Sequence, residues 1–318
     1  MPRGLNSFLS QLMRDLGSAF AAVILLAAGV WSAVAQNPTG EVPAFRADAA
    51  LVLVPVAVVD RRGAMVNGLA RDAFILTEDG VRQEIRSFSE EDAPVSLGAV
   101  LDLSGSMRSS LGAAKEALRA LMEDVNPADE AFLNVVSTRP RAYAGFTHYF
   151  DGLLARIAFE PAGGDTALID TTYESLNELR SGAHTRKALL VISDGMDNHS
   201  RHSRGELLER AVESDAQVYT IAIGNEAPFA KPMAAMEEQR GRLFLDELAR
   251  KTGGMSFVVR GGNDIREAAA TIGHALRNQY VIGYVPRGDR HDGRWHRIAV
   301  QVAGPGTRAY ARAGYRID

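Results

Sequence analysis

Three short polar stretches of the sequence carry oxygen-bearing side chains where apolar runs end or helices begin. "DLSGSM" follows the apolar run "PVSLGAVL" and offers Asp102, Ser104 and Ser106. "GGDTALID" places Thr166 just after two glycines, and "SDGMDN" follows "KALLVI" and offers Asp194. Carboxylates and hydroxyls are hard donors, which suit Mg²⁺, or Mn²⁺ and Ca²⁺, far better than zinc or copper. Two carboxylates roughly balance a divalent cation and leave a coordination position open to an incoming anion.

Each stretch also has a simpler interpretation. A D-x-S-x-S pattern after a strand is common as a helix N-cap, and only the three stretches together favour a metal site. Asp165 and Asp170 fit a solvated loop acid and a first-turn helix acid. The polar side chains after Asp194 have two interpretations: hydrogen-bonding support of the metal ligands, or loop polarity and capping of the next helix, which we expect; they are Asp197, Asn198 and Ser200. We expect Leu103 and Met107 to face the core, and the seven histidines, scattered along the chain, receive no ligand role.

An enzymatic interpretation lacks the residues it would need. A serine nucleophile at Ser104 or Ser106 requires a general base, and no G-x-S-x-G elbow with a following histidine is present. "GGDTAL" lacks the lysine and the glycine spacing of a phosphate-binding loop. We therefore expect a binding protein that is not an enzyme, although metal-assisted hydrolysis of a phosphate or ester remains an alternative.

The elements that carry these residues alternate between strand and helix from residue 93 to residue 278. Apolar runs such as "KALLVIS" are typical of buried parallel strands, and segments such as "SSLGAAKEALRALMEDV", which ends at Val125, have helical spacing. "AFLNVVST" and "RAYAGFTHYF" suit a hairpin, and Ser203 with Glu206 suits a capping box. This alternation predicts an α/β domain with a Rossmann-like, doubly wound, mainly parallel sheet. Ligands of such sheets lie outside the carboxyl ends of the strands.

Segments 48–92 and 279–318 have strand patterns and no helix of useful length. Pro55, within "LVLVPVAVVD", predicts an edge strand or a bulge. Each segment has too few strands to be stable alone, so we expect the two to pair in a small β-sandwich domain, into which the α/β domain is inserted.

The three polar motifs together resemble the metal-ion-dependent adhesion site of von Willebrand factor type A (VWA) domains. The flanking stretches "GLARDAFILTEDGVRQEIRSF" and "LRNQYVIGYVP" are similar to those of a bacterial subgroup, the VWA-related acidobacterial type. The resemblance implies that Asp102, Ser104, Ser106 and Thr166 bind Mg²⁺ directly or through water, and that Asp194 completes the shell. It also implies a protein partner whose Asp or Glu completes the coordination, as in integrin-type I domains. A structural envelope component with a vestigial site is a further alternative.

The first 35 residues have the features of a secretory signal. Arg3 and Arg14 precede "SAFAAVILLAAGVW", and small residues at Ala33 and Ala35 predict cleavage after Ala35. An uncleaved membrane anchor is the alternative. Residues 36–47 then form a linker, and we expect a periplasmic or secreted protein with no membrane span after cleavage.

Composition restricts the remaining function classes. The 318-residue chain has a net charge of −4 and no basic stripe, which argues against nucleic-acid binding. It contains no cysteine, so an exported form depends on an ordinary hydrophobic core for its stability. Partner identity and oligomeric state are not indicated by the sequence.

Overall fold

The computed structural model describes residues 51–123, 126–224, 232–260, 262–287, 293–304 and 306–316. The predicted signal segment (1–35), the linker (36–47) and Val125 lie outside these residues. No helix within the described ranges is long and apolar enough to cross a membrane.

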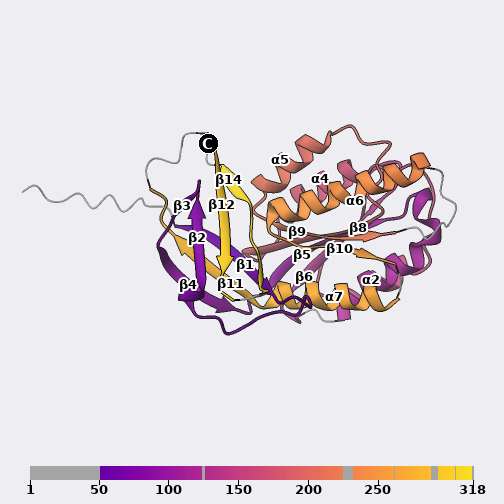
Figure 1. Cartoon of the computed structure of the whole chain (residues 1–318). Helices are drawn as coiled ribbons and strands as arrows, with labels where there is room; N and C mark the ends of the chain where they lie inside the picture. The colour runs from indigo at the N-terminus through magenta and orange to yellow at the C-terminus, as the bar shows by residue number, and fades with distance from the viewer. Residues whose placement is uncertain are drawn as a thin grey trace, which may run out of the picture. The chain divides into compact units, whose positions relative to one another are not determined.

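A six-stranded sheet forms the centre of the α/β domain (Figure 1). Its strands lie in the order β10-β9-β8-β5-β6-β7, and all pairs are parallel except β6 with β7. Their bounds are β5 Val95–Asp102, β6 Glu130–Val136, β7 Arg141–Thr147, β8 Arg186–Ser193, β9 Gln217–Ile223 and β10 Ser256–Val259. The sheet confirms the predicted doubly wound fold class, and the antiparallel pairing of β6 with β7 confirms the predicted hairpin.

Helices cover both faces of this sheet, as Figure 1 shows. The apolar cluster on one face includes α2, α3 and α7, and the cluster on the other includes α4, α5 and α6. The bounds are α2 Leu111–Glu123, α3 Phe150–Ile157, α4 Leu168–Leu179, α5 Arg204–Glu213, α6 Pro232–Thr252 and α7 Gly262–Arg277. All eight residues of β5 are buried between these layers, which explains why the strand is mostly apolar up to Leu101. The capping box predicted from Ser203 and Glu206 is present at the start of α5.

The described residues on either side of the α/β domain form two further four-stranded sheets, with the orders β13-β1-β11-β4 and β14-β12-β2-β3. Each sheet combines strands from both flanking segments. Their bounds are β1 Val52–Val59, β2 Phe74–Glu78, β3 Val81–Arg82, β4 Ile85–Glu91, β11 Gln279–Tyr284, β12 Trp295–Val302, β13 Arg308–Tyr310 and β14 Gly314–Arg316. Strands of both sheets share one apolar cluster, which includes Val54, Leu76, Tyr280 and Ile298. This is the sandwich arrangement that the fold class anticipated.

Pro55 explains a detail of strand β1. By strand order β1 is internal, because β11 and β13 flank it. However, β13 pairs only with Ala57–Val59, whereas Pro55 pairs on one side only, opposite Val281 of β11. The proline therefore lies where β1 is locally an edge, so its missing N–H removes no bond to β13.

Candidate metal centre

The topology brings the predicted acidic residues to one edge of the central sheet. Asp102 is the last residue of β5, and Asp194 directly follows β8, the parallel neighbour of β5. Strand β5 lies between β6 and β8, so the chain order reverses there. This is the switch point at which open α/β sheets bind their ligands.

Asp102 is completely buried, and each of its carboxylate oxygens accepts a hydrogen bond. Its Oδ1 accepts a hydrogen bond from the backbone N–H of Ser104 (2.9 Å), and its Oδ2 accepts one from Ser193 Oγ (2.6 Å). Burial raises the pKa of Asp102 to about 6, the hydrogen bonds from Ser193 and Ser104 oppose that rise, and the nearby charge of Asp194 adds to it. Asp194 is thus close enough for its charge to disfavour ionisation of Asp102.

Asp194 has unused bonding capacity. Its side chain is 1% exposed, and Oδ1 accepts the backbone N–H of Met196 at 3.0 Å. The other oxygen, Oδ2, is buried and has no hydrogen-bond partner. Buried carboxylate oxygens are rarely left without a donor, so this atom requires an explanation such as a bound cation.

Ser104 is the N-cap residue of the 3₁₀ helix Gly105–Ser109, and Ser106 is the second residue of that helix. Their Oγ atoms are 3.1 Å apart, within hydrogen-bond distance, and Ser104 is fully buried. Leu103 and Met107 point into the core, as predicted, and so anchor the turn on both sides of these hydroxyls.

The glycine-rich loop before α4 is hydrogen-bonded to the "DLSGSM" turn. The N–H of Gly105 donates to the carbonyl of Gly164 (3.0 Å), and the N–H of Gly163 donates to the carbonyl of Leu103 (2.8 Å). These backbone bonds hold the loop that carries Thr166 against the turn that carries the serines.

Thr166 is 3% exposed and is joined to the loop that follows Asp194. Its N–H donates to Asn198 Oδ1 (2.9 Å), and its carbonyl accepts the N–H groups of Asn198 and His199, both at 3.0 Å. The structure therefore gathers the three loops that carry Asp102, Ser104, Ser106, Thr166 and Asp194 through mutual hydrogen bonds.

The polar residues after Asp194 have a different role from the one expected. Ile169 N–H donates to Asp197 Oδ2 (2.9 Å), and Asp170 N–H donates to Ser200 Oγ (3.0 Å). These side chains therefore cap the start of α4, which precedes them in the chain. The expected capping of the next helix is wrong, because α5 receives its cap from Ser203.

Asp170 is also more than a first-turn acid. Its carboxylate accepts the N–H groups of Arg201 and His202 and lies 2.8 Å from His202 Nδ1. Burial works to raise its pKa, but these hydrogen bonds outweigh burial and hold the pKa below its usual value. Asp170 thus anchors the loop after Asp194 to α4.

Ser193 belongs to the candidate site and was not predicted from the sequence. Its Oγ donates to Asp102 Oδ2 and accepts the N–H of Gly195 at 2.9 Å, so it connects the two acidic loops. The available signal was a hydroxyl at the buried end of a strand, immediately before a candidate ligand.

The donor set fits a hard divalent cation. Within the described ranges no three acidic or histidine side chains gather as a metal cluster, so this edge offers two carboxylates and depends on hydroxyls for further donors. The unpartnered Asp194 oxygen and the raised pKa of Asp102 both indicate that positive charge would stabilise the arrangement. Oxygen-only donors of this kind suit Mg²⁺, Mn²⁺ or Ca²⁺.

Comparisons with known proteins concern the fold. No family model and no curated sequence matches the chain. Among solved structures, the chain is similar to the hypothetical protein BatB of Bacteroides thetaiotaomicron, with 16% identity, 57% of this chain and 98% of that chain covered, and a TM-score of 0.45. The von Willebrand factor type A protein of Catenulispora acidiphila gives 13% identity, 86% and 76% coverage, and a TM-score of 0.45.

A third similar structure is the vWF domain of the type V pili tip protein Mfa5 of Porphyromonas gingivalis, with 12% identity, 62% and 98% coverage, and a TM-score of 0.45. These solved structures include VWA and vWF domains, the group that the motifs of this chain resemble. At these identities and TM-scores the similarity carries no argument about the family, ligands or function of this chain.

Proposed function

We propose that this chain is a protein-binding module that depends on a divalent cation, Mg²⁺ or Mn²⁺ in the first instance. Asp102, Ser104, Ser106, Thr166 and Asp194 would hold the ion directly or through water. The observation that carries the proposal is the buried, unpartnered Oδ2 of Asp194 beside the fully buried carboxylate of Asp102.

Electrostatics support the cation. Burial and the nearby charge of Asp194 both disfavour the anionic form of Asp102, so a compensating positive charge would stabilise it. The interactions that shift the pKa of Asp102 come from burial, hydroxyls, one backbone N–H and another acid, with no basic side chain among them. A bound divalent ion would supply that charge and an open electrophilic position, which a partner's Asp or Glu suits.

The serine hydroxyls support binding in preference to hydrolysis. The Oγ atoms of Ser104 and Ser106 are paired with each other. In the described part of the chain, the histidine ring nitrogens with hydrogen bonds face Asp129, Ala128, Asp170 and Asp79, away from both serines. Among the described residues no histidine ring nitrogen is hydrogen-bonded to Ser104 or Ser106, so neither serine is paired with a histidine base of the kind that serine nucleophiles use, and we propose a protein without catalytic activity.

The site of action would be the periplasm or the extracellular space. This part of the proposal depends on the signal-like segment that ends at Ala35. Detection of a mature N-terminus at Gln36 by mass spectrometry of the exported protein would test it, and an intact N-terminus would favour the anchor.

Calorimetric titration of the purified chain with MnCl₂ and MgCl₂ tests the ion. We expect one saturable site in the wild type and none in Asp102→Ala, with both proteins folded by circular dichroism. A wild type that binds neither ion at millimolar concentration would favour a vestigial site.

Capture of partners from envelope extract tests the bridge. The wild type should retain proteins in Mg²⁺ that EDTA releases and that Asp102→Ala never retains. Equal capture in EDTA would refute the bridge. Turnover of chromogenic phosphate or ester substrates that is lost in Ser104→Ala would establish the hydrolase instead.

A further inference from the structure

Two glycines bring the candidate metal loop into direct backbone contact with helix α6. Gly195, which follows Asp194, has a φ of +79°. A Cβ built on Gly195 would lie 2.5 Å from the carbonyl carbon of Gly241 and 2.6 Å from its oxygen. A Cβ on Gly241 would lie 2.6 Å from the same two atoms of Gly195 and 2.9 Å from the carbonyl oxygen of Asp194. The contact leaves no room for a side chain at either position.

The glycine at position 241 is unfavourable for the helix itself. Gly241 lies inside α6 (Pro232–Thr252), where alanine would form helix more readily. Its neighbours across the contact are backbone atoms, which have no rotamer with which to move aside. Close approach of the loop is therefore the reason that the structure provides for glycine here.

The loop that touches Gly241 positions both candidate acids. Gly195 N–H donates to Ser193 Oγ, which in turn donates to Asp102 Oδ2. In the chain, Asp194 lies between Ser193 and Gly195, and its Oδ1 accepts the N–H of Met196. A displacement of Gly195 would therefore move Asp194 directly and would disturb Asp102 through one hydroxyl.

We propose that Gly241 is a positioning residue for the metal centre: its lack of a side chain lets α6 hold the Asp194 loop at the depth that cation binding requires. This inference rests on the proposed function. A methyl group at 241 requires a shift of about half an ångström, which is the tolerance within which a binding constellation must be held. Mg²⁺ demands near-ideal octahedral geometry, whereas Ca²⁺ accepts variable geometry and coordination number.

The test compares two Gly→Ala variants in helices. Gly112 lies in α2, and a Cβ there would meet no atom within 4 Å, so Gly112→Ala is the matched control for Gly241→Ala. Thermal unfolding in EDTA should show a higher Tm than wild type for Gly112→Ala and a lower Tm for Gly241→Ala. Helix propensity alone would raise both.

Metal titration then separates positioning from general destabilisation. Calorimetry with Mn²⁺ should show a loss of affinity of about tenfold in Gly241→Ala, as for other residues that orient metal ligands, and no loss in Gly112→Ala. The loss of Ca²⁺ affinity should be smaller than the loss for Mn²⁺ or Mg²⁺. Ile298→Val, a mild destabilisation in the separate sandwich core, should leave Mn²⁺ affinity unchanged.

The outcomes distinguish this inference from the proposed function. If the wild type binds no Mn²⁺, both fail. If the wild type binds Mn²⁺ and Gly241→Ala binds it equally well, only the positioning role is overturned, and the same holds if Gly241→Ala and Ile298→Val reduce the affinity alike.

Discussion

Two pairs of acidic residues with low exposure lie at opposite ends of the strands of the central sheet. We call these ends the carboxyl edge, where the parallel strands end, and the amino edge, where they begin. The two pairs differ in the hydrogen bonds that their carboxylate oxygens accept. At the carboxyl edge lie Asp102 and Asp194. At the amino edge lie Asp129 and Glu130, at the start of β6. Both pairs are close to strand ends, so location and burial alone do not distinguish them.

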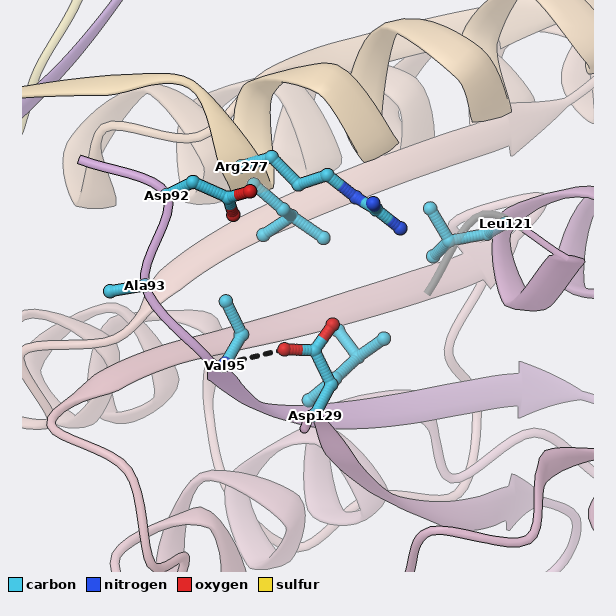
Figure 2. Close-up of a pocket in the computed structure, with 8 residues that line it drawn as sticks. Asp92, Ala93, Val95, Leu121, Asp129 and Arg277 are labelled. Carbon is cyan, nitrogen blue, oxygen red and sulfur yellow. Dashed lines mark hydrogen bonds between the residues drawn. The ribbon is translucent and has the colours of Figure 1, made fainter. Parts of the chain in front are cut away.

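The amino-edge pair is well supplied with donors. Asp129 Oδ1 accepts the N–H of Val95 (2.8 Å), as Figure 2 shows, and Oδ2 accepts the N–H of Asn126 (2.9 Å). Glu130 Oε1 accepts Ser96 Oγ (2.7 Å) and the N–H of Ala183. Burial works to raise the pKa of Glu130, but these bonds, with the nearby His184 and His148, lower it below its usual value.

The space beside the amino-edge pair is small. A cavity of about 20 Å³ is lined in part by Asp129, Leu121, Leu276 and Arg277, and in Figure 2 the Arg277 side chain extends across it toward Leu121. Such a volume holds about one water molecule. This cavity therefore holds a water molecule but no larger ligand.

The carboxyl-edge pair differs in its hydrogen bonding and in the direction of its pKa shift. Asp194 Oδ2 has no donor, and burial raises the pKa of Asp102 to about 6. Buried acids whose oxygens accept hydrogen bonds can be stable without a ligand, whereas a buried carboxylate oxygen without a donor requires an explanation. The comparison therefore favours a structural role for the amino-edge pair and supports the binding role proposed for the carboxyl-edge pair.

A large loss of metal affinity is expected in Asp194→Asn. This change removes a charge and an anionic ligand, so Mn²⁺ affinity should fall by about 100-fold, or about 2.7 kcal/mol. In EDTA the variant should be at least as stable as wild type, because repulsion with Asp102 is relieved. Calorimetry and urea unfolding measure both quantities. If Asp194→Asn bound Mn²⁺ as tightly as the wild type does, the proposed difference in role between the carboxyl-edge and amino-edge acids would be refuted.

The stability of the metal-free protein should respond to pH with opposite signs at the two edges. Because the pKa of Asp102 is raised from 3.8 to about 6, the folded state binds more protons than the unfolded state between these values. Stability should therefore fall, by an amount on the order of 3 kcal/mol, as the pH rises from about 4 to 6. The lowered pKa of Glu130 acts in the other direction: its contribution is present above its ordinary pKa and is lost as the pH falls through the folded-state pKa.

Urea unfolding in EDTA at a series of pH values resolves the two contributions. The fall between pH 4 and 6 should disappear in Asp102→Asn and persist in Glu130→Gln. A wild-type profile that Asp102→Asn leaves unchanged would contradict the expected cost of burying Asp102.

Glu130→Gln should destabilise the fold and spare the metal. The amide replaces a carboxylate that accepts bonds from Ser96 Oγ and Ala183 N–H, and bonds to a charged group contribute about 2 kcal/mol. Mn²⁺ affinity should equal that of wild type, because Glu130 lies at the opposite edge. A parallel loss of affinity would show that the two edges are coupled.

The parts that the sequence could predict depend on strand ends. Apolar runs identify β5 and β8, and parallel strands deliver their last residues to one edge whatever the loops do, so Asp102 and Asp194 could be placed together. Strand and helix periodicity likewise predicted the doubly wound sheet and the β strands at both ends of the chain.

The parts that escaped prediction depend on which polar group faces inward after packing. Asp170 and Asp197 look like ordinary loop and helix acids, yet their bonds to distant N–H groups join α4 to the loop after Asp194. The contact of Gly195 with Gly241 joins a loop to a helix far along the chain. No local pattern records such pairings, because they follow from tertiary approach and not from propensity.

Ser193→Ala should give the smallest change in metal affinity among the variants that affect the carboxyl edge. The change removes a bond to Asp102 and leaves the N–H of Gly195 without its acceptor, but it keeps every candidate ligand. We expect a loss of about 1 kcal/mol in Mn²⁺ binding, roughly fivefold in affinity, from poorer orientation of Asp102. Ser96→Ala is the counterpart at the amino edge, since Ser96 Oγ donates to Glu130, and it should reduce stability without changing Mn²⁺ affinity. If both serine variants affect Mn²⁺ alike, the hydroxyl beside each acid has the same structural role, and unused bonding capacity no longer separates the two edges.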